Sequence, residues 1–263
     1  MQRQGLGEFG RIRQFFAPLA GPGGLGLRDD AALVDCRPGY RLVATVDQAV
    51  EGVHFLPDDP PDLVAKKLLR RNLSDLAAMG AVPRHYLLTT ALPKSRGDEW
   101  LQGFAEGLAD DQRRFGIALL GGDSTSTPGP TALTLTALGE IAADTELRRS
   151  GAKPGDRVWV SGAIGDAFLG LQVLRGGFPQ LAPEHRAELI ARYRLPDPRV
   201  ALGPRLVGIA NALIDVSDGL VADLRHVCEE SGVAATIRLA SVPISEAAGL
   251  LVAEDPALRA QLA

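Results

Sequence analysis

Six aspartates at the ends of apolar runs, or inside a helix beside apolar residues, constrain this chain more than any other feature. They are Asp30, Asp47, Asp75, Asp123, Asp215 and Asp218. If folding brings these carboxylates together, their mutual repulsion must be offset by bound cations. Oxygen ligands without nearby cysteine favour hard cations such as Mg²⁺. The sequence therefore predicts an enzyme that handles phosphate with several metal ions.

Length and composition exclude several other classes of protein. A chain of 263 residues is expected to form about two domains. A net charge of -4 without a basic cluster argues against nucleic acid and anionic membranes as partners. Cys36 and Cys228 are far apart and lack metal-ligand spacing, which favours a reducing compartment. With no apolar signal core and no apolar run long enough for a bilayer, we expect a cytoplasmic protein.

The first half of the chain alternates between helix-like and strand-like patterns. Apolar residues at helical spacing predict helices over residues 8–17, 60–79 and 98–116, the last with Asp98 as its N-cap. Strands are predicted over residues 31–35, 41–46, 85–92, 117–120 and 131–141. The glycine-rich residues 21–26 are expected to form a loop.

A polar stretch over residues 142–149 predicts a boundary between two α/β domains, residues 1–145 and residues 146–263. In the second domain we expect strands over residues 157–161, 213–216 and 234–239. Helices are expected to begin at residues 167 and 217, and the final stretch is also expected to be helical.

Asp75 allows a structural and a functional interpretation. It shares one face of its predicted helix with Asn72, Leu76 and Met79, which places a carboxylate beside core residues. Metal ligation explains that position, and so does an ion pair with Arg71 or simple exposure to solvent. Both interpretations stay open from this helix alone.

The other aspartate motifs have the same ambiguity. Thr45 and Asp47 lie on one face of a predicted strand and can share a cation. The glycine pair before Asp123 lets a phosphate approach the backbone, or forms a plain turn. Ser217 or Asp218 can cap the next helix, whose N-terminus also favours phosphate oxygens. The chain contains no GxxxxGK[ST] motif, which excludes the P-loop class.

Taken together and in order, these motifs resemble those of the thiamine-monophosphate kinase family, in the superfamily that includes aminoimidazole ribonucleotide synthetase and selenophosphate synthetase. The resemblance runs from residue 7 to the end of the chain. It rests on RDDAA at 28–32, TVD at 45–47, VEGVHFLP at 50–57, NLSDLAAMG at 72–80, GGDS at 121–124, RSGAKPGD at 149–156 and IDVSDGL at 214–220. The HFLP segment at 54–57 separates this family from its superfamily relatives, so the match is specific.

The resemblance implies ATP-dependent phosphorylation of thiamine monophosphate to thiamine diphosphate. It implies direct in-line transfer with several Mg²⁺ ions and no acid, base or nucleophile from the protein, and it leaves a K⁺ requirement open. The implied metal ligands are Asp30, Thr45, Val46, Asp47, Asp75, Asp123, Asp215 and Asp218. The implied ATP contacts are Gly122, Asp123, Arg149 and Ser217, and the implied substrate contact is His54.

The fold implied by the resemblance is a two-domain α/β (α+β) fold in which the N-terminal sheets of two chains form a dimeric barrel. Two substitutions depart from the family pattern. Arg28 replaces a glycine, and Val46 replaces a hydroxyl residue, which leaves only a backbone carbonyl for a metal. The family's Gly-Gly-Asp/Glu-Asp-Tyr-Glu segment, which holds thiamine, has no counterpart up to Ala263. An incomplete C-terminal domain is therefore expected.

Two alternative functions stay open at this point. One is another ATP-using enzyme of the same superfamily that acts on a different small phosphate or amide. The other is a catalytically silent dimer that binds ATP, because the acceptor segment is missing. A panel of acceptors separates the first alternative from the leading interpretation, and a comparison of turnover with binding tests the second.

Overall fold

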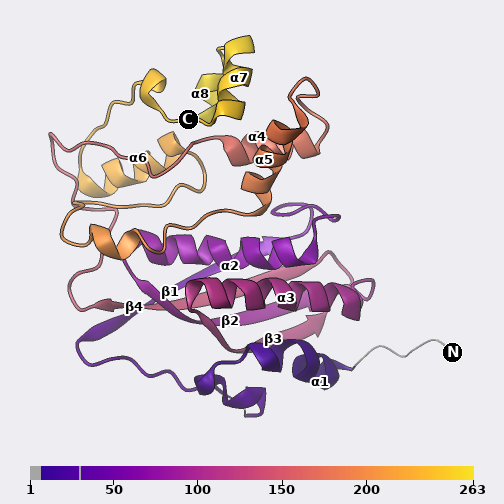
Figure 1. Ribbon diagram of the computed structural model, residues 1–263. Coiled ribbons are helices and arrows are strands. Elements are labelled where there is room, and N and C mark those ends of the chain that lie inside the picture. Colours follow the sequence, from indigo (N-terminus) through magenta and orange to yellow (C-terminus); the bar gives the residue numbers. More distant parts are fainter. Residues whose placement is uncertain (1–6, 30) are drawn as a thin grey trace.

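The computed structural model describes residues 7–29 and 31–263. The described chain forms a mixed α/β protein, as predicted, with a four-stranded sheet near one end and helices at the other (Figure 1). The strands are β1 (Tyr40–Val50), β2 (Val82–Leu92), β3 (Ala118–Ser126) and β4 (Ala132–Ala142). Their order is β1-β4-β2-β3, with β4 antiparallel to both neighbours and β2 parallel to β3.

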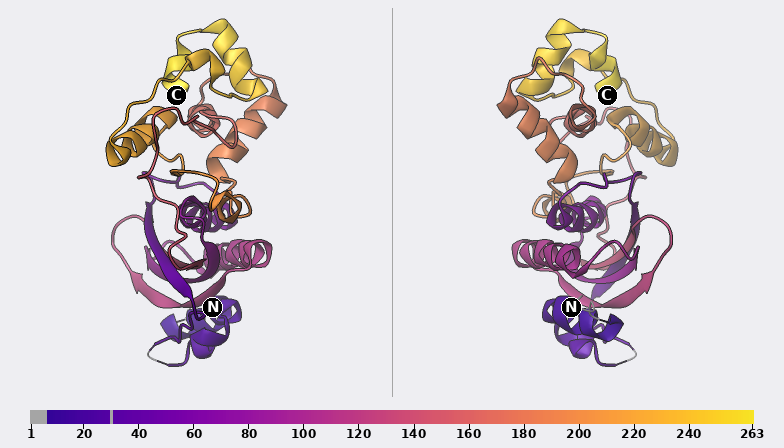
Figure 2. Two further views of the ribbon diagram at one scale, coloured as in Figure 1. Left: turned by 90° about the vertical axis from the view of Figure 1, so that its left-hand side faces the viewer. Right: turned by 90° about the vertical axis from the view of Figure 1, so that its right-hand side faces the viewer.

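Two long helices, α2 (Pro61–Ala78) and α3 (Asp98–Phe115), lie on one face of this sheet (Figure 2). Helix α2 begins with a proline, which fits this position because the first backbone N–H groups of a helix have no acceptor within the helix. Gly80, with a φ of 75°, follows the end of the helix. Leu68, Leu73 and Leu135 are fully buried between α2 and the sheet. Each such side chain contributes about 1.5–3 kcal/mol through burial. The predicted N-cap of α3 was wrong by one residue, because Gly97 occupies that position.

The opposite face of the sheet carries no helix in the described part of the chain (Figure 2). Val46, Thr136 and Leu87 stand opposite one another on three neighbouring strands and share this open face. Val46 is 60% exposed and Leu87 is 39% exposed. One side of the sheet is therefore a solvent-facing surface of threonine and aliphatic side chains.

Short helical segments precede the sheet. They are α1 (Glu8–Arg11), η1 (Ile12–Phe16), η2 (Ala17–Leu19) and η3 (Pro22–Leu27). Phe15, Phe16 and Leu19 are buried against the main core, which explains the predicted amphipathic pattern. The predicted loop at residues 21–26 was wrong, since most of it forms 3₁₀ turns.

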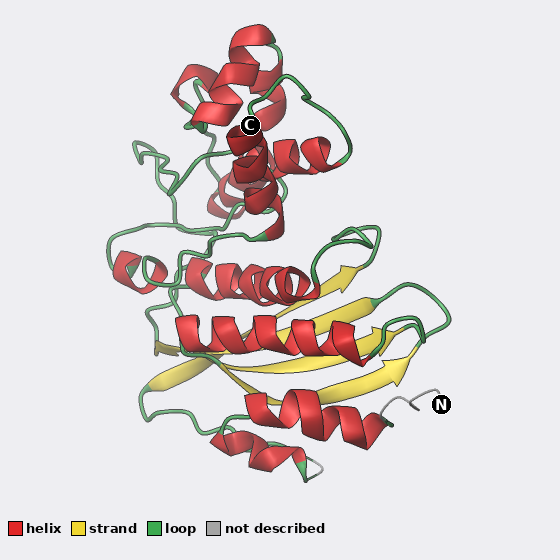
Figure 3. Cartoon of the chain, turned by 45° about the vertical axis from the view of Figure 1, so that its right-hand side comes forward, coloured by secondary structure: helices red, strands yellow, loops and turns green. Residues whose placement is uncertain are grey.

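The C-terminal part contains helices, turns and extended segments (Figure 3). Its helices are α4 (Asp166–Leu174), α5 (Pro183–Arg194), η4 (Gly203–Leu206), α6 (Leu220–Ser231), η5 (Leu239–Ser241), α7 (Glu246–Glu254) and α8 (Leu258–Leu262). Leu169, Leu189 and Leu251 form the centre of a second buried cluster there. No helix in the described residues is long and apolar enough to cross a membrane.

Four predicted strands do not form: residues 31–35, 157–161, 213–216 and 234–239 belong to no ladder. Side-chain alternation predicts an extended segment, but a strand also needs a neighbour for its backbone hydrogen bonds. Leu33 is 64% exposed and Trp159 is 81% exposed, so apolar side chains of these segments lack a covering layer among the described residues.

A buried ion pair joins the helical layer to the segment after α5. Arg70 of α2 donates to both carboxylate oxygens of Asp111 of α3, at 2.7 and 2.8 Å. The same guanidinium donates to the Pro196 carbonyl at 3.1 Å. The two side chains satisfy each other's buried hydrogen-bonding groups, and the bond to Pro196 fixes the position of the segment after α5.

Candidate active site

Thr45 and Asp75 meet between β1 and α2. Thr45 lies on the covered face of β1, and its hydroxyl donates to Asp75 Oδ2 at 2.6 Å. Burial is the main cause that raises the pKa of Asp75 to about 6, and the negative charges of Asp215 and Asp47 contribute to this rise. The Thr45 hydrogen bond and Arg71 act in the opposite direction. Three of the predicted aspartates therefore lie close enough to repel one another.

Asp47 is held by a cation from the neighbouring helix. Arg71 Nη2 donates to Asp47 Oδ1 at 3.1 Å, and Asp47 is partly exposed at the edge of the cluster. Arg71 therefore forms its ion pair with Asp47 on β1 and not with Asp75 on its own helix. Arg71 supplies one positive charge to a group of three carboxylates, so negative charge is left over.

Asp215 approaches the cluster from the C-terminal part, in the extended segment before α6. Burial raises its pKa, and the charges of Asp223 and Asp47 act in the same direction. A hydrogen bond from Ser74 and the charge of Arg149 oppose the rise. The predicted nucleotide residue Arg149 is thus brought near a predicted metal ligand.

Asp223, which the sequence analysis did not single out, organises the loop before α6. Its Oδ2 accepts from the backbone N–H groups of Ser217, Asp218 and Gly219, at 2.9, 3.1 and 3.2 Å. The prediction that Ser217 or Asp218 caps α6 was wrong, because Gly219 is the N-cap and no side chain of these two caps it. An acidic residue in the first turn of a predicted helix is the signal that could have identified Asp223.

Gly122 and Asp123 lie within β3, so the predicted strand end at residue 120 was too early. A Cβ at Gly122 would lie 1.7 Å from the carbonyl oxygen of Leu88 on β2, which explains why only glycine fits. Gly122 thus serves close strand packing, whereas a Cβ at Gly121 would meet only the Leu87 side chain, at 3.7 Å.

Asp123 is not part of the carboxylate cluster within one chain. Its neighbour Ser124 accepts a hydrogen bond from Thr90, which is buried on the covered face of the sheet. Side chains alternate along a strand, so Asp123 faces the open side. Asp47 is on the covered side and on β1, at the other edge of the sheet. Three strand spacings separate the two edges, about 14 Å.

The remaining predicted residues lie as follows. His54 follows β1, and its Nδ1 accepts from the Val50 backbone N–H at 3.1 Å. The Val46 side chain points to the open face, away from Asp75, and Asp218 is exposed. Asp30 lies outside the described residues.

An open cleft of about 330 Å³ lies between the segment after β4 and the segment after η4. It is lined by residues of the segments 144–150 and 207–211. Its size falls within the range of about 300–1,000 Å³ that is typical of small-molecule sites. Arg148 and Ser150 line this cleft, whereas the predicted nucleotide residue Arg149 between them does not.

The donor chemistry of the cluster fits a hard cation. Asp47, Asp75 and Asp215 supply carboxylate oxygens, and burial together with neighbouring carboxylates raises the pKa values of Asp75 and Asp215. Over residues 7–29 and 31–263, however, no three Asp, Glu, His or Cys side chains stand in a ready-made metal-binding arrangement. The metal assignments therefore stay predictions.

Comparison with known proteins first defines the class. Residues 28–141 match the family model described as "AIR synthase related protein, N-terminal domain". Thiamine-monophosphate kinase from Caulobacter vibrioides is 43% identical over 251 residues, which cover 95% of this chain and 70% of the relative. The crystal structure of the same enzyme from Stenotrophomonas maltophilia superposes with a TM-score of 0.82 at 40% identity, covering 90% of this chain and 75% of that one.

A third comparison is with a solved structure of AaThiL complexed with AMPPCP and TMP. It has a TM-score of 0.78 and 30% identity, with 97% of this chain and 81% of that chain covered. The chain belongs to the thiamine-monophosphate kinase family. The predicted resemblance and the predicted enzyme class, a kinase, are both confirmed by these relatives.

Proposed function

We propose that this protein phosphorylates thiamine monophosphate to thiamine diphosphate with ATP, in the cytoplasm. The observation that carries the proposal is the convergence of Asp47, Asp75 and Asp215 beside Arg149, in a chain whose relatives are thiamine-monophosphate kinases. An oxygen of the acceptor phosphate attacks the γ-phosphorus in line, the bond from that phosphorus to the bridging oxygen breaks, and ADP leaves. Both reactants are anions, so alignment and charge neutralisation matter more than proton transfer.

The cluster would hold Mg²⁺ ions that neutralise charge on the phosphate oxygens. Asp47, Asp75 and Asp215 would be ligands, with the Thr45 hydroxyl beside them and Asp30 and Asp218 as further candidates. Arg149 would orient the nucleotide phosphates, and His54 would donate a hydrogen bond to the acceptor. A K⁺ requirement is left to assay in Na⁺ and K⁺ buffers.

We further propose that two copies associate through the open face of the sheet as a dimeric barrel. Asp123 faces that side and is too far from Asp75 to serve the same metal cluster within one chain. If Asp123 serves this metal site, it would therefore have to come from the second copy. The exposed aliphatic side chains of Val46 and Leu87 on this face support the arrangement.

The proposed domains are residues 1–145, which contain the sheet and its helices, and residues 146–263. We regard the second as incomplete, because its three extended segments have no strand partners among the described residues. The separate buried clusters around Leu135 and Leu189 support the division.

The test is turnover of the purified chain with ATP, Mg²⁺ and a panel of acceptors, followed by separation of the products. Thiamine diphosphate formed from thiamine monophosphate alone supports the proposal. ADP formed only with another phosphate or amide acceptor would establish a different enzyme of the superfamily. Binding of an ATP analogue by calorimetry without any turnover would establish a silent ATP-binding protein.

A further inference from the structure

The loop that carries His54, residues 50–59, is held in a defined shape. Gly52 N–H donates to the Phe55 carbonyl at 2.8 Å, and His54 N–H donates to the Val50 carbonyl at 2.9 Å. The Phe55 side chain is only 2% exposed and anchors the loop in the main core. We name this segment the His54 loop.

The hydrogen bond at Nδ1 determines which nitrogen of His54 carries the proton. Nδ1 accepts from the Val50 N–H, so the hydrogen of the neutral ring is on Nε2. Among the described residues, Nε2 has no hydrogen-bond partner of its own. His54 therefore keeps an Nε2 donor that is available to a ligand.

Arg96, in the connection between β2 and α3, contacts both ends of the His54 loop. Its Nη2 lies 3.1 Å from Glu51 Oε2 and donates to the Pro57 carbonyl at 2.9 Å. Its Nε donates to Thr131 Oγ1 at 3.4 Å, and the guanidinium lies over the Trp100 ring. Arg96 and Glu51 are each 19% exposed, so solvent screens this pair only in part.

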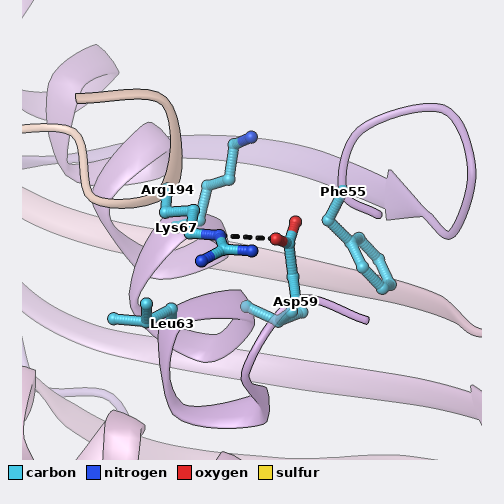
Figure 4. Close-up of a pocket in the computed structure, with 6 residues that line it drawn as sticks. Phe55, Asp59, Leu63, Lys67 and Arg194 are labelled. Atoms are coloured by element: carbon cyan, nitrogen blue, oxygen red, sulfur yellow. Dashed lines mark hydrogen bonds and ion pairs between the residues drawn. The ribbon is translucent and has the colours of Figure 1, made fainter. Parts of the chain in front are cut away.

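Arg194, at the end of α5, contacts the loop from the C-terminal part of the chain. Its Nε donates to Asp59 Oδ1 at 2.6 Å (Figure 4). The other oxygen of Asp59 accepts from the Leu56 N–H at 2.8 Å. The Asp59 side chain is almost completely buried, and Figure 4 shows Arg194 directed at it beside Phe55. The carboxylate thus links α5 to the backbone of the loop.

We propose that Arg96 and Arg194 are positioning residues that fix the His54 loop for the acceptor phosphate, and that they have no comparable part in nucleotide binding. This inference rests on the proposed function. Neither arginine needs to touch the substrate. Because the loop is ordered before the acceptor arrives, binding does not have to supply that ordering, and the Nε2 donor is already in place.

The test compares kinetic constants of Arg96→Met and Arg194→Met with those of the wild-type protein. The KM for thiamine monophosphate should rise about tenfold to a hundredfold, while the KM for ATP changes less than about twofold. Arg113→Met, which removes an arginine from an exposed ion pair on α3, is the matched control and should change neither constant. Arg96→Lys should recover part of the loss, because it restores the charge but not the fork of donors.

Two double variants show whether the effect runs through the proposed residues. Glu51→Gln combined with Arg96→Met should be no worse than Arg96→Met alone, since both changes break one pair. In a His54→Ala background, Arg96→Met should leave the already raised KM for thiamine monophosphate unchanged. Additive effects in both double variants would overturn the inference.

The remaining outcomes are equally decisive. If the wild-type protein turns over thiamine monophosphate and both arginine variants keep its KM, only the positioning inference fails. If both KM values rise together with a fall in Tm, the arginines have a general structural role and the inference fails as well. If the wild-type protein shows no turnover with thiamine monophosphate, the proposed function itself fails, and this inference with it.

Discussion

The hydroxyl of Thr45 and the carboxylate of Asp75 are joined by a hydrogen bond of 2.6 Å that connects β1 to α2. The bond stabilises the ionised form of Asp75, yet burial and two neighbouring carboxylates outweigh it and raise the pKa to about 6. The same side chain is therefore suited to a cation and unfavourable for the stability of the metal-free protein.

We expect Asp75→Asn to stabilise the metal-free protein in a pH-dependent way. The folded-state pKa of about 6 exceeds the ordinary value of 3.8, so ionisation costs the folded state stability as the pH rises between these values. The gain should be near zero below pH 3.8 and reach about 1–2 kcal/mol above pH 6, after allowance for solvent screening. Urea denaturation in EDTA across this range measures it. Asp58→Asn, at an exposed position, should show no such pH dependence.

Asp47→Asn should remove most Mg²⁺-dependent turnover while leaving the fold intact. Loss of one charged ligand weakens every ion it touches, and we expect a fall of about a hundredfold in kcat/KM at ordinary Mg²⁺ concentration. Steady-state assays with a Mg²⁺ titration measure the change, and Glu184→Gln, at an exposed position of α5, serves as control. Near-normal activity in the Asp47 variant would remove it from the metal site.

Gly122→Ala should destabilise the sheet, because the new Cβ would overlap the Leu88 carbonyl oxygen. Relief requires β2 and β3 to separate, at a cost of about 3 kcal/mol or more. Gly249→Ala in α7 is the matched control, since its Cβ would meet no atom within 4 Å. That change should stabilise the protein by about 0.5–1 kcal/mol. Thermal melts of the two variants should therefore shift in opposite directions.

Arg70→Met should cost about 3–5 kcal/mol of folding stability, because it leaves the buried Asp111 carboxylate without its partner. Replacing both residues, as in Arg70→Met with Asp111→Leu, should restore much of the loss. Chemical denaturation of the single and double variants measures the coupling. If the loss of stability in the double variant equals the sum of the losses in the single variants, the ion pair is not the cause of the destabilisation.

Leu87→Lys should convert a dimer into monomers, since it places a charge among the exposed aliphatic side chains of the open sheet face. Light scattering coupled to size-exclusion chromatography measures the mass. Ile209 lies away from the sheet and is 75% exposed, so Ile209→Lys should leave the mass unchanged. A wild-type protein that is already monomeric at micromolar concentration would contradict the proposed dimer.

The N-terminal elements were predictable because their signals are local. Helices α2 and α3 have clear apolar stripes and glycine after their ends, and β4 alternates from Leu133 to Ile141. The sequence also predicted the extended segments of the second half, but an extended segment becomes a strand only where another segment pairs with its backbone. That information is not contained in the segment itself.

The carboxylate cluster was predictable in part. Strand and helix periodicity placed Thr45, Asp47 and Asp75 correctly for contact, and the structure brings them together. The position of Asp123 depends on the strand order and on which face its strand turns outward, and neither follows from the motif around it. The pairing of Arg71 with Asp47 and the contacts of Arg96 were missed because they join residues far apart in sequence, which spacing does not reveal. Asp223, in contrast, binds residues 217–219, and its place in the first turn of α6 was a local signal.

The pairing of β1 with β4 also affects how the chain folds during synthesis. Tyr40 stands opposite Ala142 and Val50 opposite Ala132, so the strand carrying Thr45 and Asp47 is made long before its partner. At about 5–20 residues per second, the delay on the ribosome is roughly 5–20 s. Through that interval β1 has neither its ladder nor a finished core to cover it. The strand that bears Thr45 and Asp47 is therefore exposed as an unpaired edge until β4 has been made.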